Sequence, residues 1–418
     1  MKTYKISTLG CRTNRYESKA YESQLLRTGY REAKEGEKVD LHIVNTCTVT
    51  ASSDKKSLYA IRRAGKEGGG RLVVTGCMVN RAADTIRAIP GVTDVVANER
   101  KADLLASLLP ETEWPEFRVE RFEGKTRAFL KIQDGCNSYC SYCVIPFVRG
   151  RSRSRRLPDI LSEAEQLVDN GYREIVLTGI NIGDFDGGET KRPVRLSHLV
   201  EKLDRIEGLE RIRISSIDPD EVDPSLLRAV LSCKKACGSM HIVLQSGSNL
   251  ILKRMRRKYT RQEFVRATEA LRKGDPDFTF TTDVIVGFPG ESEGDFAETL
   301  RLVREIRFAK VHIFPYSDRP KTRASRMANK VSREVIGERK KRLLRVVDEA
   351  AYALRERYVG RTFDILLEGE NMGRTTHFIP VVLEKSPTGR RRRPNEIVRA
   401  YCKANDEEGL VGEEVSRG

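Results

Sequence analysis

Short apolar runs alternate with amphipathic helical stretches along residues 1–110. The apolar runs end at Gly10, Thr46 and Gly76, and a fourth occupies residues 92–97. The helical stretches between them include residues 15–27 and 52–66. Strand and helix segments that alternate in this way predict a parallel sheet with covering helices. We therefore expect an N-terminal open parallel α/β sheet over residues 1–110.

A polar connector at residues 111–126 leads into a second alternation with longer units. Six runs are expected as strands, at residues 127–134, 174–179, 211–217, 240–245, 278–286 and 310–315. Helical stretches such as residues 158–170 and 292–306 lie between them. Because the common parallel barrel needs about eight such units to close, the pattern predicts a central partial (β/α)6 barrel.

The last third of the chain changes character. Residues 331–357 have few helix breakers and many Lys, Arg and Glu, which predicts one long, exposed helix that completes a second domain over residues 127–357. Short β runs follow, at residues 362–367, 377–383, 397–403 and 409–415. They predict a small C-terminal all-β domain over residues 358–418, in the form of a partly open barrel.

Composition narrows the class of protein. Lys plus Arg number 76 and Asp plus Glu 60, which gives a formal net charge of +16, and 39% of residues are hydrophobic. The chain is therefore a folded basic protein, and a surplus of this size favours a polyanionic partner such as nucleic acid. No apolar run approaches the about 20 residues of a spanning helix. The N-terminus also lacks a signal-peptide pattern, so we expect a cytoplasmic protein with no membrane contact.

Three cysteines follow the first expected barrel strand with the spacing C-x3-C-x2-C: Cys136, Cys140 and Cys143. Soft thiolates this close in sequence converge on one metal centre. A [4Fe–4S] cluster usually takes four cysteines, so three thiolates would leave one iron open to a small molecule. The alternative is a structural zinc site, which needs a fourth ligand.

Three further cysteines, Cys11, Cys47 and Cys77, each follow an expected strand of the N-terminal sheet. The carboxyl ends of parallel strands meet at one crevice, so these thiols are expected to converge in space. The small neighbours Gly10, Thr46 and Gly76 would let a bulky cluster approach the backbone. The alternative is three buried apolar cysteines.

The segment GCNSYCSYC, with Tyr142 at its aromatic position, resembles the signature of radical S-adenosylmethionine (SAM) enzymes. Together with the N-terminal trio, it resembles the radical SAM methylthiotransferase family over essentially the whole chain. The segments that carry this resemblance include TLGCRTNRYES (8–18), NTCTVT (45–50), DGCNSYCSYCVIP (134–146), RGRSRSR (149–155), LTGINIG (177–183), HIVLQSGS (241–248) and TTDVIVGFPGE (281–291). The resemblance implies an N-terminal three-cysteine domain, a radical SAM barrel and a C-terminal RNA-binding TRAM domain.

The family's chemistry implies two [4Fe–4S] clusters and two SAM molecules per turnover. One SAM methylates a sulfur held by the cluster at Cys11, Cys47 and Cys77. A second SAM is cleaved at the other cluster to a 5′-deoxyadenosyl radical, which removes hydrogen from the target carbon. Residues at or near strand ends are expected to meet SAM or the target nucleoside: Tyr142, Thr178, Gly179, Ser215, Ser216, Gln245, Asp283 and Gly287.

Basic segments are uneven along the chain, and they suit a phosphate backbone. Residues 146–156, 253–261 and 319–345 each carry a basic excess, whereas residues 358–418 hold ten basic and ten acidic residues. The alternative is an ordinary solvated helix face. The expected RNA contacts are Arg149, Arg151, Arg153, Arg155, Arg256, Arg257, Arg390, Arg391, Arg392 and Arg393.

Known targets of the family are adenosines beside the tRNA anticodon and an aspartate of a ribosomal protein. TLGCRTN and RGRSRSR look most like the type that acts on threonylcarbamoyladenosine 37, so the expected partners are a tRNA anticodon stem-loop and a low-potential flavodoxin- or ferredoxin-type electron donor. Isopentenyladenosine 37 and the ribosomal aspartate remain alternatives. A reading of another class is a non-catalytic iron–sulfur RNA-binding factor.

Five further side chains give weaker signals. Cys233 and Cys237, spaced C-x3-C, are expected to be structural, and Cys402 is expected to be a small core residue. His241 and His312, in barrel strands, are expected to be interior histidines with satisfied hydrogen bonds rather than catalytic bases.

Overall fold

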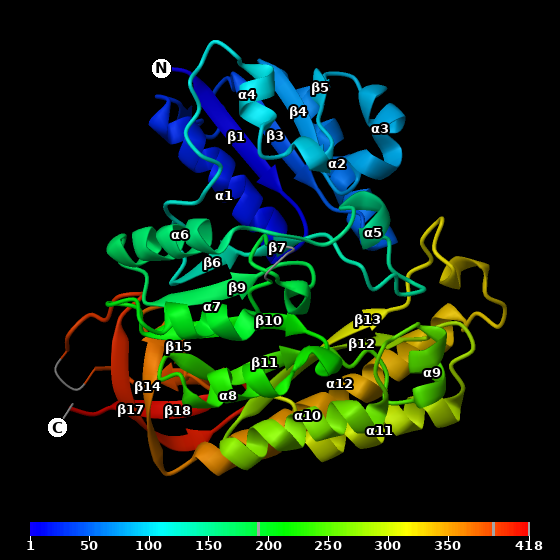
Figure 1. Cartoon of the computed structure of the whole chain (residues 1–418), viewed down its shortest axis with the longest axis vertical. Helices are drawn as coiled ribbons and strands as arrows, with labels where there is room; N and C mark the ends of the chain where they lie inside the picture. Colours follow the sequence, from blue (N-terminus) through cyan, green and yellow to red (C-terminus); the bar gives the residue numbers. More distant parts are fainter. Residues whose placement is uncertain (190–192, 387–388, 417–418) are drawn as a thin grey trace.

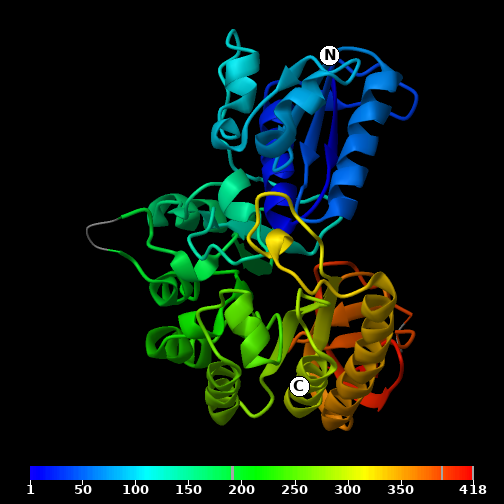
Figure 2. The ribbon, with the colours of Figure 1, turned by 90° about the vertical axis from the view of Figure 1, so that its right-hand side faces the viewer.

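The computed structural model describes residues 1–189, 193–386 and 389–416. Its strands form a five-stranded sheet, a six-stranded sheet and a closed five-stranded barrel, in chain order. Figure 1 shows the N-terminal sheet at one end of the molecule, with the second sheet beneath it and the small barrel at the lower left. Figure 2 shows the same two tiers after a quarter turn. This is the α/β architecture that the sequence predicts.

The N-terminal sheet is parallel throughout, with strand order β2-β1-β3-β4-β5. Its strands are β1 (Thr3–Thr8), β2 (Arg31–Glu32), β3 (Leu41–Thr46), β4 (Arg71–Gly76) and β5 (Asp94–Val95). Its helices are α1 (Arg12–Arg27), α2 (Ala51–Glu67), α3 (Val79–Arg87), η1 (Asn98–Arg100) and α4 (Leu104–Leu108). The central strand β3 is buried along its whole length, as expected for a parallel strand with both faces covered. Strand β2 was not predicted.

The second sheet is an open half-barrel whose strands are neighbours in chain order, β13-β12-β11-β10-β9-β6. Its strands are β6 (Arg127–Lys131), β9 (Glu174–Thr178), β10 (Arg211–Ile217), β11 (Ala236–Ile242), β12 (Thr279–Val286) and β13 (Lys310–Pro315). The helices between them are α6 (Leu157–Asp169), α7 (Leu196–Leu203), α8 (Pro224–Ser232), α9 (Asn249–Arg254), α10 (Arg261–Gly274) and α11 (Glu293–Ile306). Short 3-10 turns are η2 (Ile182–Asp184), η3 (Pro219–Glu221) and η4 (Ala324–Arg326).

Two barrel strands differ from the prediction at their ends. The first stops at Lys131, because Gln133–Asp134 turns away as β7 to pair with β8 (Arg153–Ser154). The fourth lies at Ala236–Ile242, earlier than residues 240–245, since Gln245 adopts a left-handed backbone (φ 63°) and keeps only an isolated bridge to Val284. Both changes leave polar side chains at the carboxyl ends of the strands.

The long basic helix is α12 (Arg333–Arg355), and its expected exposure is wrong for one face. Leu343, Val346 and Val347 belong to the same apolar cluster as the barrel strands. These residues recur at helical spacing, which places them on one stripe. The many charged residues around them hid this stripe in the sequence.

The C-terminal barrel follows α12 and a 3-10 turn, η5 (Glu356–Tyr358). Its strands are β14 (Arg361–Leu367), β15 (Met372–Arg374), β16 (Pro380–Leu383), β17 (Ile397–Asn405) and β18 (Leu410–Glu414). The barrel is closed rather than partly open, because β16 pairs with β18 in parallel. Cys402 lies in its apolar core, which confirms that prediction.

The small barrel lies at the amino ends of the half-barrel strands. Arg211 at the start of β10 donates a hydrogen bond to the carbonyl of Arg374 (2.9 Å), and Thr279 at the start of β12 donates to the carbonyl of His377. Residues that follow β9 and β13, at the carboxyl ends, contact the N-terminal domain: the Gly179 carbonyl accepts from Thr13 (3.4 Å), and Ser317 Oγ accepts from Ala51 N–H (3.0 Å). Among the helices of the described residues, none is long and apolar enough to cross a membrane.

Candidate metal centres at the junction of two sheets

The N-terminal cysteine trio lies at the carboxyl ends of three neighbouring strands. Cys11 follows β1, Cys47 follows β3 and Cys77 follows β4. Cys47 and Cys77 are buried, and Cys11 is exposed. Burial raises the pKa of the Cys47 thiol, and the neighbouring Cys77 and Cys11 thiols raise it further. That mutual influence shows that the three sulfurs share one small region, as the spacing predicts.

Two glycines beside this trio allow the ends of the strands to pack closely around the cysteines. A Cβ on Gly10 would lie 2.9 Å from Cys47 Sγ, and Gly10 has a left-handed backbone (φ 97°). A Cβ on Gly76 would lie 2.4 Å from the backbone nitrogen of Thr46. Only glycine fits both positions, so the strand ends can close around the cysteines.

Alanine at Gly10 should therefore empty the N-terminal site while the rest of the fold survives. We expect Gly10→Ala to lose about half of the iron bound by the wild-type chain, because the new methyl group displaces Cys47 and strains the backbone. Gly29→Ala is the matched control, since Gly29 has a similar backbone (φ 83°) but no atom within 4 Å of the new Cβ. Equal iron content in the two purified, reconstituted variants would contradict this account.

The second trio lies in the loop that follows β6 and β7. Cys136, Cys140 and Cys143 are all partly buried, and burial raises the pKa of Cys143 to about 12. The loop is fixed from two sides, because Ser141 N–H donates to the carbonyl of Met255 (2.9 Å) and the Ser141 carbonyl accepts from Ala324 N–H (2.8 Å). The thiolate is the form that binds a metal, so these thiols would release their protons on binding one.

The spacing of the sulfurs bears on the choice between zinc and a cluster. Zinc–sulfur bonds of about 2.3 Å place tetrahedral ligands about 3.8 Å apart. Within the described residues, neither cysteine trio has its three sulfurs all within 4.8 Å of one another. Both trios are therefore more widely spaced than the ligands of one tetrahedral zinc ion, and each offers one thiol fewer than a closed zinc site takes.

One cavity connects the two cysteine loops. It has a volume of about 180 Å³ and is lined by Val49, Thr50, Tyr142, Cys143, Val144, Gln245, Asp283, Ile285 and residues 314–317. Val49 and Thr50 come from the loop after Cys47, whereas Cys143 belongs to the second trio. Gln245 Oε1 is buried and has no hydrogen-bond partner among the described residues. An unpartnered carboxamide oxygen beside a metal-binding loop marks a place for a ligand that donates a hydrogen bond.

The cavity gathers some of the side chains expected to meet SAM or the nucleoside, and not others. Tyr142, Gln245 and Asp283 line it. Thr178, Gly179, Ser215 and Ser216 lie at or near the ends of β9 and β10 but outside its lining, and so does Gly287. A Cβ on Gly287 would lie 2.2 Å from Ile336 of α12, so that glycine serves helix packing.

His241 and His312 lie beside Asp283 on three adjacent strands. One ligand atom from each of the three lies within 4.8 Å of the others. His241 shares a hydrogen bond with Thr281 Oγ1 (2.9 Å), as expected for an interior histidine. Its Nε2 lies 3.4 Å from Asp283 Oδ1, outside hydrogen-bond geometry.

The arginines expected to bind RNA separate into buried and exposed groups. Arg149, Arg257 and Arg392 are buried and paired with carboxylates, so phosphate contact is wrong for these three. Arg155 is also held inside, 2.6 Å from Glu163. The exposed ones are Arg151, Arg153, Arg256, Arg390, Arg391 and Arg393. The sequence could not separate them because their partners are distant in the chain.

A buried charge network that the sequence did not reveal joins the two sheets. Glu17 of α1 is fully buried and pairs with Arg149 (3.0 Å), Lys131 (2.8 Å) and Lys101. Asp134 completes the network, 2.8 Å from Arg149. The only signal in the sequence was that Glu17, Asp134 and Arg149 all lie within the motif segments. Its position ties the N-terminal sheet to the second cysteine loop.

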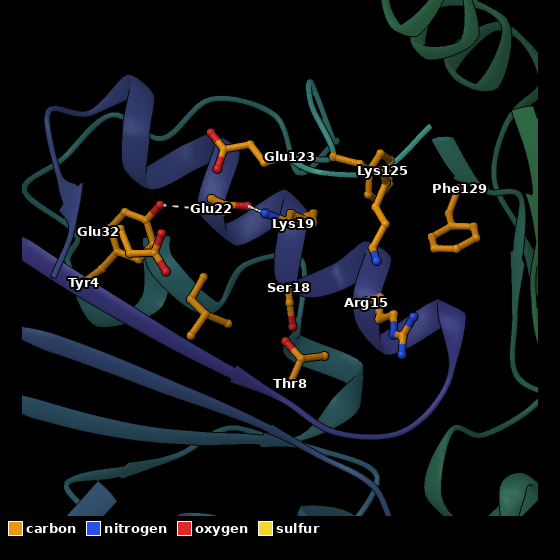
Figure 3. Close-up of a pocket in the computed structure, with 12 residues that line it drawn as sticks. Tyr4, Thr8, Arg15, Ser18, Lys19, Glu22, Glu32, Glu123, Lys125 and Phe129 are labelled. Carbon is orange, nitrogen blue, oxygen red and sulfur yellow. Dashed lines mark hydrogen bonds and ion pairs between the residues drawn. The ribbon is translucent and has the colours of Figure 1, made fainter. Parts of the chain in front are cut away.

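A separate cavity beside β1 and α1 lacks this chemistry (Figure 3). Its lining includes Tyr4, Lys19, Glu22 and Lys125 and contains none of the six cysteines. Lys19 forms an ion pair with Glu22, which also accepts a hydrogen bond from Tyr4 at 3.4 Å. Charges that neutralise one another in this way leave little for a ligand, so we do not place the site here.

Comparison with known families agrees with both halves of the site. Residues 130–303 match the radical SAM superfamily, and residues 3–98 match a family described as uncharacterized protein family UPF0004. The structure resembles the radical SAM methyltransferase TsrM from Kitasatospora setae, with a TM-score of 0.57, 13% identity, and coverage of 78% of this chain and 77% of that one. The half-barrel and its C-x3-C-x2-C loop thus define a radical SAM enzyme, a class that uses a [4Fe–4S] cluster and SAM.

Relatives of similar length specify the family. A threonylcarbamoyladenosine tRNA methylthiotransferase MtaB from Chlamydia pneumoniae is 44% identical over 98% of both chains. The Bacillus subtilis protein of the same name is 38% identical over 92% of this chain and 91% of its own. A tRNA-2-methylthio-N(6)-dimethylallyladenosine synthase from Caldicellulosiruptor saccharolyticus is 36% identical over 88% and 82%. This chain belongs to the radical SAM tRNA methylthiotransferases.

Proposed function

We propose that this enzyme attaches a methylthio group to carbon 2 of N6-threonylcarbamoyladenosine at position 37 of tRNA. The observation that carries the proposal is a cavity that joins the two cysteine loops, with Cys143 on one side and Val49 and Thr50 on the other. A reaction that brings sulfur to a carbon radical needs both centres beside one substrate atom.

The donor sets fit two [4Fe–4S] clusters. Each trio offers three thiols, one fewer than a cluster of this kind usually takes, so each would leave one iron for a small ligand. When bound, two clusters and two SAM molecules supply a transferable methylated sulfur and a 5′-deoxyadenosyl radical. Electrons are proposed to come from a flavodoxin- or ferredoxin-type donor.

The chain's own residues position the ligands. The buried Gln245 Oε1 is free to accept a hydrogen bond from an amino or hydroxyl group in the cavity. The Asp283 carboxylate, in the same lining, also accepts hydrogen bonds. Tyr142 is packed edge-on against Phe288 (82° between the rings), so its ring forms a fixed apolar wall that excludes water beside Cys143. We propose that SAM and the flipped adenosine bind here, with Thr178, Gly179, Ser215 and Ser216 at the rim.

A comparison of two tRNA substrates, one with threonylcarbamoyladenosine and one with isopentenyladenosine, tests the proposed target against its main alternative. The Chlamydia pneumoniae relative named for threonylcarbamoyladenosine is 44% identical to this chain, whereas the Caldicellulosiruptor saccharolyticus relative named for dimethylallyladenosine is 36% identical. We expect the reduced enzyme, given SAM, to methylthiolate the threonylcarbamoyl tRNA at least about tenfold faster than the isopentenyl tRNA, a difference of about 1.4 kcal/mol. A preference for the isopentenyl tRNA would show that the proposed substrate is wrong and that the proposed reaction is right. Absence of both products and of 5′-deoxyadenosine would favour a non-catalytic RNA-binding protein.

Exposed basic and aromatic side chains surround a second opening to the second cysteine loop. This cavity is lined by Tyr139, Cys140, Ser141, Cys143, Phe147, Arg256, Lys321, Thr322, Arg323 and Arg326. Tyr139 and Phe147 are exposed, which suits stacking with unpaired bases, and the cations suit phosphates. We propose that the anticodon stem-loop binds here and that the exposed Arg151 and Arg153 make further contacts with the tRNA. Three further arginines, Arg390, Arg391 and Arg393, lie on the small C-terminal barrel, where Arg390 pairs with Glu396. We propose that they contact another part of the tRNA.

Removing two of these cations should weaken tRNA binding without altering the chemistry. We expect Arg323→Ala/Arg326→Ala to raise the KM for tRNA several-fold and to reduce the salt slope of log Kd by up to about 2, because each lost phosphate contact removes about one unit. Filter binding across a salt series measures this slope. Arg301→Ala/Arg304→Ala removes the same charge from the exposed face of α11 and should leave the slope unchanged. Equal slopes in the two double variants would place the RNA elsewhere.

A further inference from the structure

Each cysteine trio has one buried arginine that donates a hydrogen bond to one of its sulfurs. Arg149 Nε lies 3.2 Å from Cys77 Sγ, and Arg257 Nη1 lies 3.0 Å from Cys140 Sγ. Both guanidinium groups are almost fully enclosed, with 1% and 6% of their side chains exposed. In both cases the donor comes from a part of the chain remote from the cysteine.

Buried carboxylates and amides hold Arg149 in place. Its Nη1 donates to Glu17 at 3.0 Å and to Asp134 at 2.8 Å, and its Nη2 donates to Asn14 Oδ1. Arg149 follows α5 (Ile145–Val148), which itself follows the second trio. It therefore crosses from the half-barrel to the N-terminal sheet and can take only one position beside Cys77.

Arg257 is held in an equivalent way. Its Nη2 donates to Asp218, which lies just after β10, and its guanidinium lies 4.7 Å from the centre of the Tyr259 ring. The left-handed backbone of Arg256 (φ 57°) ends α9 and turns the next side chain inward. The carboxylate and the ring hold the guanidinium so that Nη1 lies against Cys140, while Nε has no hydrogen-bond partner among the described residues.

We propose that Arg149 and Arg257 set the reduction potentials of the two clusters, each acting on the cluster whose cysteine it contacts. This inference rests on the two clusters of the proposed function. Reduction adds one negative charge to a cluster, and a donor that carries a permanent positive charge stabilises that charge more than it stabilises the oxidised form. The effect is strong here because both sites are buried, where electrostatic interactions are weakly screened. Both arginines are positioning residues that act through cysteine sulfur.

Both sites have cationic surroundings. Around Cys77, the cations Arg149, Lys101 and Lys131 exceed the anions Glu17 and Asp134 by one. Around Cys140, Arg257 is paired with Asp218, and the exposed cations Arg256, Lys321, Arg323 and Arg326 line the adjoining cavity. We therefore expect each potential to depend on the buried arginine that contacts a sulfur of that site.

A potentiometric titration followed by electron paramagnetic resonance tests the assignment. It uses the reconstituted full-length chain, with each cluster observed alone in a Cys47→Ala or a Cys140→Ala background. We expect Arg149→Met to lower the reduction potential of the N-terminal cluster by at least about 59 mV. For a one-electron couple, this shift is a tenfold change in the ratio of reduced to oxidised cluster. The barrel cluster should stay within twofold. Arg257→Met should give the reciprocal result.

Control variants separate a redox role from a packing role. Arg149→Gln keeps an N–H donor but removes the positive charge, so the reduction potential of the N-terminal cluster should also fall in this variant. Arg155→Met removes a nearby arginine that pairs with Glu163, 2.6 Å away, and it should shift neither potential. Unchanged potentials with full iron content, or equal shifts at both clusters, would overturn the inference. Loss of iron from both Arg149 variants would overturn it too, because Arg149 would then be a structural requirement. A wild-type chain that binds only one cluster would instead refute the proposed function.

Discussion

Alanine at Cys47 should abolish methylthiolation of tRNA while SAM is still cleaved to 5′-deoxyadenosine. Cys47 lies at the end of β3 and shares a small region with Cys11 and Cys77, so its loss removes a ligand from the N-terminal site alone. The second trio is held by Met255 and Ala324, which this change does not touch. The loss of methylthiolation should far exceed the about 10- to 100-fold that removal of an outer-shell partner costs.

Anaerobic assays of both products measure this separation. Cys140→Ala should eliminate both methylthiolation and SAM cleavage, because it removes a ligand from the second trio. Cys233→Ala is the matched control, since Cys233 ends α8 and belongs to neither trio. If Cys47→Ala lost SAM cleavage as completely as Cys140→Ala, the division of labour between the trios would be wrong.

Replacing Glu17 by glutamine should destabilise the junction of the two sheets by about 3–5 kcal/mol, the usual cost of breaking a buried ion pair. Glu17 is completely buried and faces Arg149, Lys101 and Lys131. Its removal leaves these cations with Asp134 as the remaining carboxylate of the network. Denaturant unfolding monitored by circular dichroism measures the change. Glu67→Gln, which loses exposed pairs with Lys5 and Arg63, should cost less than about 1 kcal/mol.

The effect of Glu17→Gln on the free energy of unfolding should depend on pH. Burial alone would raise the pKa of Glu17, but Arg149, Lys101 and Lys131 outweigh burial and hold that pKa well below its usual value. A depressed pKa contributes stability above the unfolded value of about 4.3, and this contribution is lost as the pH falls. The stability gap between wild type and Glu17→Gln should therefore be constant from pH 5 to pH 8 and narrow below about pH 4.3. A gap that is unchanged at low pH would show that Glu17 stabilises the junction by packing rather than by charge.

The positions of the cysteines could be predicted from the sequence because strand ends and spacing are local properties. Cys11, Cys47 and Cys77 each follow a strand whose apolar run is visible in the chain, and parallel strands bring such ends together. The open half-barrel followed from the count of β/α units for the same reason. The prediction of the reaction came from the family resemblance, because the positions of the cysteines alone do not determine it.

The arginines show what sequence could not provide. Arg149 and Arg257 lie in basic runs that are typical of a phosphate-binding surface, and nothing near them in the chain signals burial. Their positions depend on Glu17, which lies 132 residues from Arg149, and on Asp218, which lies 39 residues from Arg257. The closed C-terminal barrel was missed for a similar reason, since it depends on the non-local pairing of β16 with β18.

Mass spectrometry of nucleosides from total tRNA tests the central claim most directly. Cells that lack this protein would be compared with cells that carry the wild-type chain or its Cys47→Ala variant. We predict that 2-methylthio-N6-threonylcarbamoyladenosine appears only with the wild-type chain and that its unthiolated precursor accumulates in the other two strains. Presence of the methylthio nucleoside at wild-type levels in the Cys47→Ala strain would contradict the account.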